Sequence, residues 1–246
     1  MKILQSACFL LGCSFAFLSC QKDAITTLEP SVLNPNPAVN KCDYSPYSVG
    51  STFTFELASK NIQANKWSFA ENKGSMTRLL DTLTQKYSVG VSFFPQDTSV
   101  KKTESFIRCD AMGLYVLAKG INNGKDMELP MLQFPLVVGK TWKSAVVTTT
   151  FSGGNSTFYY EYKVIKTGTS RLVKTTTFTD VAEIQESIVL STQYTGSPAI
   201  SQTNSYTRFY DKKAGVVETI FFSQNPFMPS VKDTSMVQKL VAYNVK

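Results

Sequence analysis

The sequence predicts an all-β or nearly all-β body, either an antiparallel sandwich or an open barrel, built from two related halves. Three observations lead to this prediction. Apolar and polar residues alternate over short segments, turn signals separate these segments, and one set of residues recurs in the same order along the chain. With 246 residues, of which 43% are hydrophobic, the chain is long and apolar enough to bury a sizeable core.

The alternation is clearest in TFTFEL, where Phe53, Phe55 and Leu57 fall on one face of an extended strand. Further β-rich segments are 114–118, 126–132, 142–151, 156–166, 171–178, 181–192, 203–210, 216–222 and 236–243. Turns are expected at Asn123-Gly124, at Gly153-Gly154-Asn155, at Gly168 and in the DKKAG run that ends at Gly215. Only residues 77–86 have helical spacing.

The recurring residues indicate an internal duplication. PYSVGSTF at 46–53 matches PLVVGKTW at 135–142, and TESFIR at 103–108 matches TNSYTR at 203–208. This alignment places Gly50 on Gly139, Phe53 on Trp142 and Arg108 on Arg208, and it predicts that Phe53 and Trp142 are buried. We expect the first half to span residues 42–125 and the second half residues 126–246.

The N-terminal residues predict a lipoprotein export signal. Lys2 precedes an apolar stretch from Ala7 to Leu18, which is well short of the ~20 residues that span a bilayer. We expect residues 1–19 to be a signal peptide, Cys20 to carry the lipid and the Pro-containing residues 20–41 to form a tether. Cleavage at Cys13 and an ordinary secretory signal are the alternatives.

The start of the mature chain carries a resemblance to a known group of proteins. The CQKD sequence at Cys20 resembles the export tag of Bacteroidota surface lipoproteins, and Asp81-Thr82-Leu83 resembles the O-glycosylation acceptor of the same bacteria. With the tether and the repeated strand starts, the layout is similar to small uncharacterised Bacteroidota lipoproteins. The resemblance implies a lipid anchor in the outer membrane and display at the cell surface, with the periplasmic face as the alternative. It implies no catalytic or binding residue.

The composition argues against several classes of chemistry. The chain contains no His, which excludes Ser-His-Asp and Cys-His catalysis and any zinc site that uses His. We therefore predict no catalytic residue, no metal and no cofactor. Lys and Arg are scattered singly despite a net charge of +7, so nucleic acid is not an expected partner.

The predicted function is that of a non-enzymatic envelope protein that binds or presents a glycan, a lipid or a protein. The alternatives are a glycan hydrolase that uses carboxylates alone and a purely structural component.

Five residues are candidates for binding. Glu186 falls in step with apolar neighbours on its strand, so it is expected to point inward, either as a ligand contact or catalytic acid or as the partner of a Lys or Arg. A bulge in the strand at this position is a further alternative. Phe106 shares a strand face with Arg108, and Tyr206 with Arg208. An aromatic ring beside a guanidinium suits sugar or carboxylate recognition, and a structural stack or ion pair is the alternative.

Cys42 and Cys109 are the two cysteines beyond the expected lipid anchor. In an oxidising, exported setting they are candidates for a disulfide, which would contribute at most ~4 kcal/mol by the chain-entropy model. Two unpaired thiols are the alternative.

Overall fold

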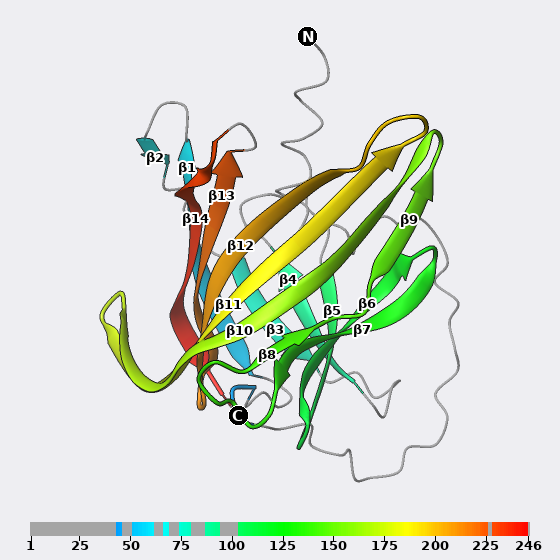
Figure 1. The fold of residues 1–246 in the computed structure, drawn as a ribbon. Coiled ribbons are helices and arrows are strands. Elements are labelled where there is room, and N and C mark those ends of the chain that lie inside the picture. Colours follow the sequence, from blue (N-terminus) through cyan, green and yellow to red (C-terminus); the bar gives the residue numbers. More distant parts are fainter. Residues whose placement is uncertain are drawn as a thin grey trace, which may run out of the picture.

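The computed structural model of the protein describes residues 43–45, 51–61, 66–68, 74–79, 87–93, 103–225 and 228–245. Every regular element in these residues is a β-strand, and the fourteen strands form one antiparallel sheet (Figure 1). The path through the sheet ends at β7 (Lys125–Gln133) and β8 (Thr141–Lys143), which do not pair, so the sheet is not a closed barrel. The predicted all-β, open and antiparallel fold is confirmed. The described residues contain no helix that is long and apolar enough to cross a membrane.

The strand order repeats along the chain. The first group consists of β1 (Thr52–Asn61), β3 (Gly74–Leu79), β4 (Ser88–Phe93), β5 (Thr103–Asp110), β6 (Gly113–Asn122) and β7. The second group consists of β8, β10 (Gly154–Val173), β11 (Thr176–Tyr194), β12 (Ile200–Asp211), β13 (Gly215–Asn225) and β14 (Met228–Asn244). Within each group the strands pair in chain order, and β1 pairs with β14 to join the groups. Two short strands lie off this path: β2 (Lys66–Ser68) pairs with β1, and β9 (Val147–Phe151) pairs with β10.

This repeated order is what two related halves would produce. Phe53 on β1 and Trp142 on β8, the first strands of the two groups, are 2% and 6% exposed, so both are buried as predicted. The pairing of β7 with β6 groups residues 125–133 with the first set of strands. The residue-by-residue superposition of the halves stays a prediction.

The sheet bends so that the two groups face each other across a core. Leu114 on β6 and Leu132 on β7 cluster with Trp142, Tyr162 and Ile184 of the second group. We call the side of β10, β11 and β12 that carries these residues the inner face. In Figure 1, β10 to β12 pass in front of the strands of the first group.

A second core lies on the opposite side of the same strands. Val173 and Phe178, next to the turn between β10 and β11, cluster with Phe53, Phe209 and Leu240. The β10–β11 register shifts three times between Val164 and Arg171, and such bulges bend a strand. The bend places the end of the β10–β11 hairpin that carries Val173 and Phe178 on the side of the sheet opposite the inner face. There it covers the second core.

Two local predictions were wrong. Residues 77–79 belong to strand β3, not to a helix, because they pair with β1 and β4; residues 80–86 lie outside the described part of the chain. Gly168 lies within β10, where its φ of +65° falls at a bulge, and the chain turns after Val173 instead. The turns expected at Asn123-Gly124 and in the DKKAG run are confirmed, because β6–β7 and β12–β13 are hairpins around them.

Candidate functional site

Glu186 occupies the centre of the inner face. It lies on β11 directly opposite Tyr162 of β10 and Tyr206 of β12, and none of its surface is exposed. Its Oε1 atom lies 3.2 Å from Nη1 of Arg208 and accepts a hydrogen bond from the Tyr210 hydroxyl at 3.3 Å. Glu186 thus points inward, as its alternation with apolar neighbours predicts. Within the described part of the chain, its Oε2 atom has no hydrogen-bond partner.

The electrostatics of this cluster reflect its burial. Burial raises the pKa of Glu186, while the charge of Arg208 and the hydroxyls of Tyr210 and Tyr206 act in the opposite direction. Burial alone would lower the pKa of Arg208, but Glu186 and the neighbouring tyrosines outweigh it and raise that pKa. The arrangement is that of a buried ion pair surrounded by tyrosine rings, which is the structural alternative expected for these residues.

A row of aromatic rings leads away from this cluster along β10. Trp142 stacks on Tyr162 with ring centroids 5.2 Å apart, and Tyr162 stacks on Tyr160 at 6.2 Å. Phe158 meets Tyr160 edge to face at 6.0 Å. Trp142 and Tyr162 are buried, whereas Tyr160 and Phe158 are half-buried. The row therefore runs from the core to a more open part of the sheet.

We call the inner-face residues Phe158, Tyr160, Ile188 and Leu190 the distal face. Tyr160 is paired with Ile188 and Phe158 with Leu190, so the four side chains lie on one side of the sheet, and all are half-buried. Beside them on β12, Gln202 donates a hydrogen bond to Asn204 at 3.2 Å. The sequence analysis did not predict this face. Ile188 and Leu190 continue the inward-facing apolar positions beyond Glu186, and this pattern could have indicated it.

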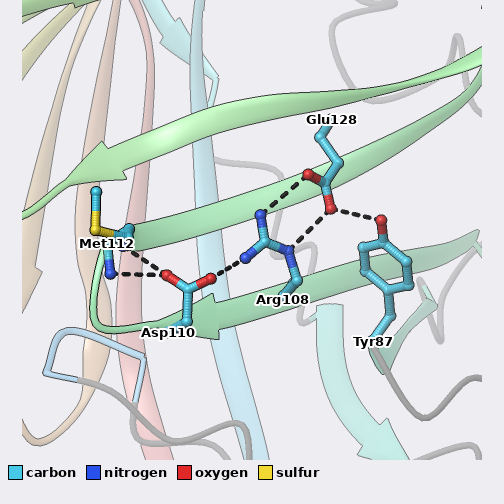
Figure 2. A network of polar contacts seen from close by, with 6 residues as sticks. Tyr87, Arg108, Asp110, Met112 and Glu128 are labelled. Carbon is cyan, nitrogen blue, oxygen red and sulfur yellow. Dashed lines mark hydrogen bonds and ion pairs between the residues drawn. The ribbon is translucent and has the colours of Figure 1, made fainter.

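Arg108 belongs to a separate network (Figure 2). Its Nε and Nη2 atoms donate to Oε1 and Oε2 of Glu128 at 2.9 and 3.0 Å, and Nη1 forms an ion pair with Asp110. The Tyr87 hydroxyl also donates to Glu128 Oε1, at 2.5 Å. Hydrogen bonding to Glu128 is the largest effect that raises the pKa of Arg108. The guanidinium is therefore engaged with carboxylates of the protein itself.

The two aromatic and arginine pairs have different surroundings. Phe106 is covered by the ammonium group of Lys119, which lies 3.7 Å from its ring centroid. The Tyr206 ring lies 5.3 Å from Cζ of Arg208 and 5.5 Å from the ring of Phe221. The matching positions in the sequence thus serve two different structural networks. Arg108 pairs with acids on β5 and β7, whereas Arg208 pairs with an acid on β11.

Cys109 is disulfide-bonded and lies 5% exposed in the inner core, where Tyr44 is also a member. Its partner is outside the described residues, as are Cys20, Cys42 and Thr82. Cys42 precedes Tyr44 by only two positions, which supports the predicted pairing of Cys42 with Cys109. That pairing stays a prediction. No cluster of three or more potential metal-ligating residues occurs in the described ranges.

Fold and site together define an open, single-sheet β protein whose inner face holds a buried ion pair and continues into a half-open aromatic face. No family model and no curated protein matches the chain. Two solved structures match the chain over most of its length. One is a presumed lipoprotein from Parabacteroides distasonis, with 14% identity, a TM-score of 0.49 and coverage of 83% of this chain and 99% of that one. The other is a presumed exported protein with a YmcC-like fold from Bacteroides fragilis, with 11% identity, a TM-score of 0.44 and coverage of 81% and 97%.

Proposed function

We propose that this chain is a non-enzymatic protein of the cell envelope, anchored by a lipid on Cys20, that binds a partner through its distal face. The observation that carries the proposal is the half-open aromatic surface on β10 and β11, at the end of the sheet remote from the N-terminal residues of the body. We place the protein at the outer membrane facing outward, with the periplasmic face as the alternative.

The geometry holds the distal face away from the point where the expected tether joins the body. The backbone nitrogen of Tyr44 donates to the carbonyl of Lys212, which directly follows the last residue of β12. β12 has 12 residues and begins at Ile200, so its two ends are about 35 Å apart at ~3.3 Å per residue. Figure 1 shows residues 43–45, in blue, near the end of the sheet opposite the β11–β12 connection.

The burial and contacts of three acidic residues support a non-enzymatic role. A glycan hydrolase that uses carboxylates alone needs two of them at an open cleft, ~5 to 9.5 Å apart, and one must hold a proton. Glu186 is fully buried and paired with Arg208. Glu128 and Asp110 both pair with Arg108, so their carboxylates are occupied by contacts within the protein. These acids are better placed to hold the fold than to transfer protons.

The anchor is tested by fatty-acid labelling. Replacing Cys20 with Ala should abolish incorporation of labelled fatty acid and release the protein from the membrane fraction, because the lipid is attached to that thiol. Cys13→Ala is the matched control and should leave both unchanged. Labelling that survives in Cys20→Ala and is lost in Cys13→Ala would show that the cleavage site is Cys13.

Binding through the distal face is tested by photo-crosslinking in the cells that make the protein. A benzophenone amino acid at position 190 should give a discrete adduct, because this group reacts with C–H bonds of a glycan, lipid or protein held against the face. The control carries the same group at position 213, an exposed site after β12 at the other end of the body. Adducts that are absent at 190, or equal at the two positions, contradict the proposed binding face.

A further inference from the structure

The end of the sheet beyond the distal face has an unusual charge distribution. The chain carries a net charge of +7, yet residues 144–160 and 187–207 contain no Asp, Glu, Lys or Arg. These two segments form β9, the upper part of β10 and β11, and the beginning of β12. The connections at 152–153 and 195–199 lie together at the top of the sheet in Figure 1. We call Phe151, Tyr194, Ile200 and these two connections the tip.

The tip presents apolar side chains in a fixed arrangement. Phe151, Tyr194 and Ile200 are 37%, 51% and 65% exposed. The rings of Phe151 and Tyr194 meet edge to face at 5.8 Å, and both residues pair with Gly154. A Cβ atom at Gly154 would lie 3.0 Å from the Phe151 ring and 2.3 Å from the Gln193 carbonyl oxygen. Glycine therefore allows the Phe151 ring to lie against the strand.

The neighbouring strand end is also held in place. The side-chain oxygens of Asn122 and Asn123 accept hydrogen bonds from the backbone nitrogens of Thr148 and Thr150 on β9, each at 3.4 Å. The β6–β7 hairpin thus supports β9 from the side that does not pair with β10. A supported strand loses little conformational entropy when a ligand binds to it.

The polar side chains of these two segments are all uncharged. Ser152, Asn155, Thr195 and Ser197 are exposed beside the apolar residues. Rigid aromatic rings supply contact area at low entropic cost, and hydroxyl and amide groups supply adaptable hydrogen bonds. This combination matches the surface of a sugar ring, which has both C–H faces and hydroxyl groups. An acidic polymer would need cations, which these segments lack.

A membrane fits the tip less well than a glycan does. The tip lies at the far end of β12 from Lys212, beside which the chain enters the body at Tyr44, so an anchored protein holds it away from its own bilayer. Adsorption to anionic headgroups also depends on Lys or Arg near the surface. No such residue occurs in residues 144–160 or 187–207.

We propose that the tip is a binding site for a neutral glycan, with Phe151 and Tyr194 as the platform for a sugar ring and the neighbouring hydroxyl and amide groups as its hydrogen-bond partners. This inference deepens the proposed function and rests on it. The distal face, which continues from Tyr194 down β11, extends the same site along the glycan chain.

The test uses envelope polysaccharide from the producing cells, separated by anion exchange into a neutral and an acidic fraction. The full-length protein should bind the neutral fraction, and the variants Phe151→Ala and Tyr194→Ala should each lose at least tenfold in affinity. Leu172→Ala, at an exposed apolar position near the other end of the β10–β11 hairpin, should bind as the parent protein does. Because all three side chains are exposed, we expect each variant to keep the thermal unfolding midpoint of the parent.

Three outcomes overturn the inference. The first is an absence of binding to the neutral fraction while the crosslink at position 190 still forms, which leaves the proposed function intact with a partner of another class. The second is binding that is unchanged in Phe151→Ala and Tyr194→Ala. The third is tip-dependent binding to phosphatidylethanolamine vesicles in place of the neutral fraction. Loss of the crosslink at position 190 is separate and contradicts the proposed function itself.

Discussion

Removal of one partner of the ion pair between Glu186 and Arg208 should strongly destabilise the second group of strands. Glu186 is 0% exposed and the Arg208 side chain is 11% exposed, so removal of the acid leaves a guanidinium almost without water or a counter-charge. Breaking a buried pair by removing one partner typically costs about 3 to 5 kcal/mol. We therefore expect Glu186→Ala to lower the free energy of unfolding by about that amount, a large fraction of the ~5 to 15 kcal/mol of a typical domain.

The measurement is urea unfolding followed by tryptophan fluorescence, with Glu183→Ala as the matched control. Glu183 lies on the same strand and pairs at 3.6 Å with Lys166, whose side chain is 61% exposed. Exposed pairs of this kind contribute less than about 1 kcal/mol. Glu186→Gln keeps the shape and an acceptor for Arg208, so it should be less destabilised than Glu186→Ala and serves if the Ala variant does not fold.

A double variant separates the pair from its surroundings. Glu186→Leu combined with Arg208→Met removes both charges, so it should lose less stability than the sum of the two single changes. Equal losses for Glu186→Ala and Glu183→Ala would refute the reasoning. Additive losses in the double-mutant cycle would also refute it, because the two charges would then not interact.

Three further predictions follow from the same structure. Trp142→Ala should cost about 3 to 5 kcal/mol of unfolding free energy in urea titrations, because the ring is buried on Tyr162 and its Nε1 donates to the Pro130 carbonyl at 2.8 Å; a loss below 1 kcal/mol would contradict this. Thiol labelling of the unfolded, unreduced protein should find Cys42 and Cys109 blocked, and quantitative labelling of both would exclude their disulfide. The folded pKa of Glu186 lies above its ordinary value of 4.5, so its protonation favours folding at low pH, and this contribution is lost as the pH rises through the folded pKa. Relative to Glu186→Gln, the parent protein should therefore lose stability in urea titrations as the pH rises above 4.5, and identical pH profiles would contradict the assignment.

The strand pattern was predictable where one face of a strand is buried and the other is exposed. Phe53 and Trp142 follow this rule, and so does Glu186, whose inward direction came from its position between apolar neighbours. The rule failed at Leu79, where apolar spacing suggested a helix. That residue pairs with Val89 of β4, and such long-range pairing is not visible in the local sequence.

The site was predictable only in part, because residue type does not reveal the partner. Arg108 and Arg208 occupy matching places in the repeated sequence, but their acids do not. Arg108 pairs with Asp110 and Glu128, which follow it in the chain, whereas Arg208 pairs with Glu186, which precedes it. The turn after Val173 was also missed, because bulges at Gly168 let β10 continue through a residue that usually marks a turn. The spacing of residues in the sequence was enough to select Arg108, Arg208 and Glu186 as candidates. Their partners could be identified only from the fold.

The unequal lengths of the two halves explain why part of the inner face is left open. β6 and β7 have 10 and 9 residues, whereas β10 and β11 have 20 and 19. At ~3.3 Å per residue, the first group can cover only about half the length of the longer strands. One end of β10 and β11 bends over the outer core, the middle packs against the first group, and the remaining end projects. The row formed by Tyr162, Glu186 and Tyr206 is the last row before that projection in which all three residues are buried, and the ion pair lies at its base. The longer middle strands of the second group thus leave part of the inner face uncovered without disturbing either core.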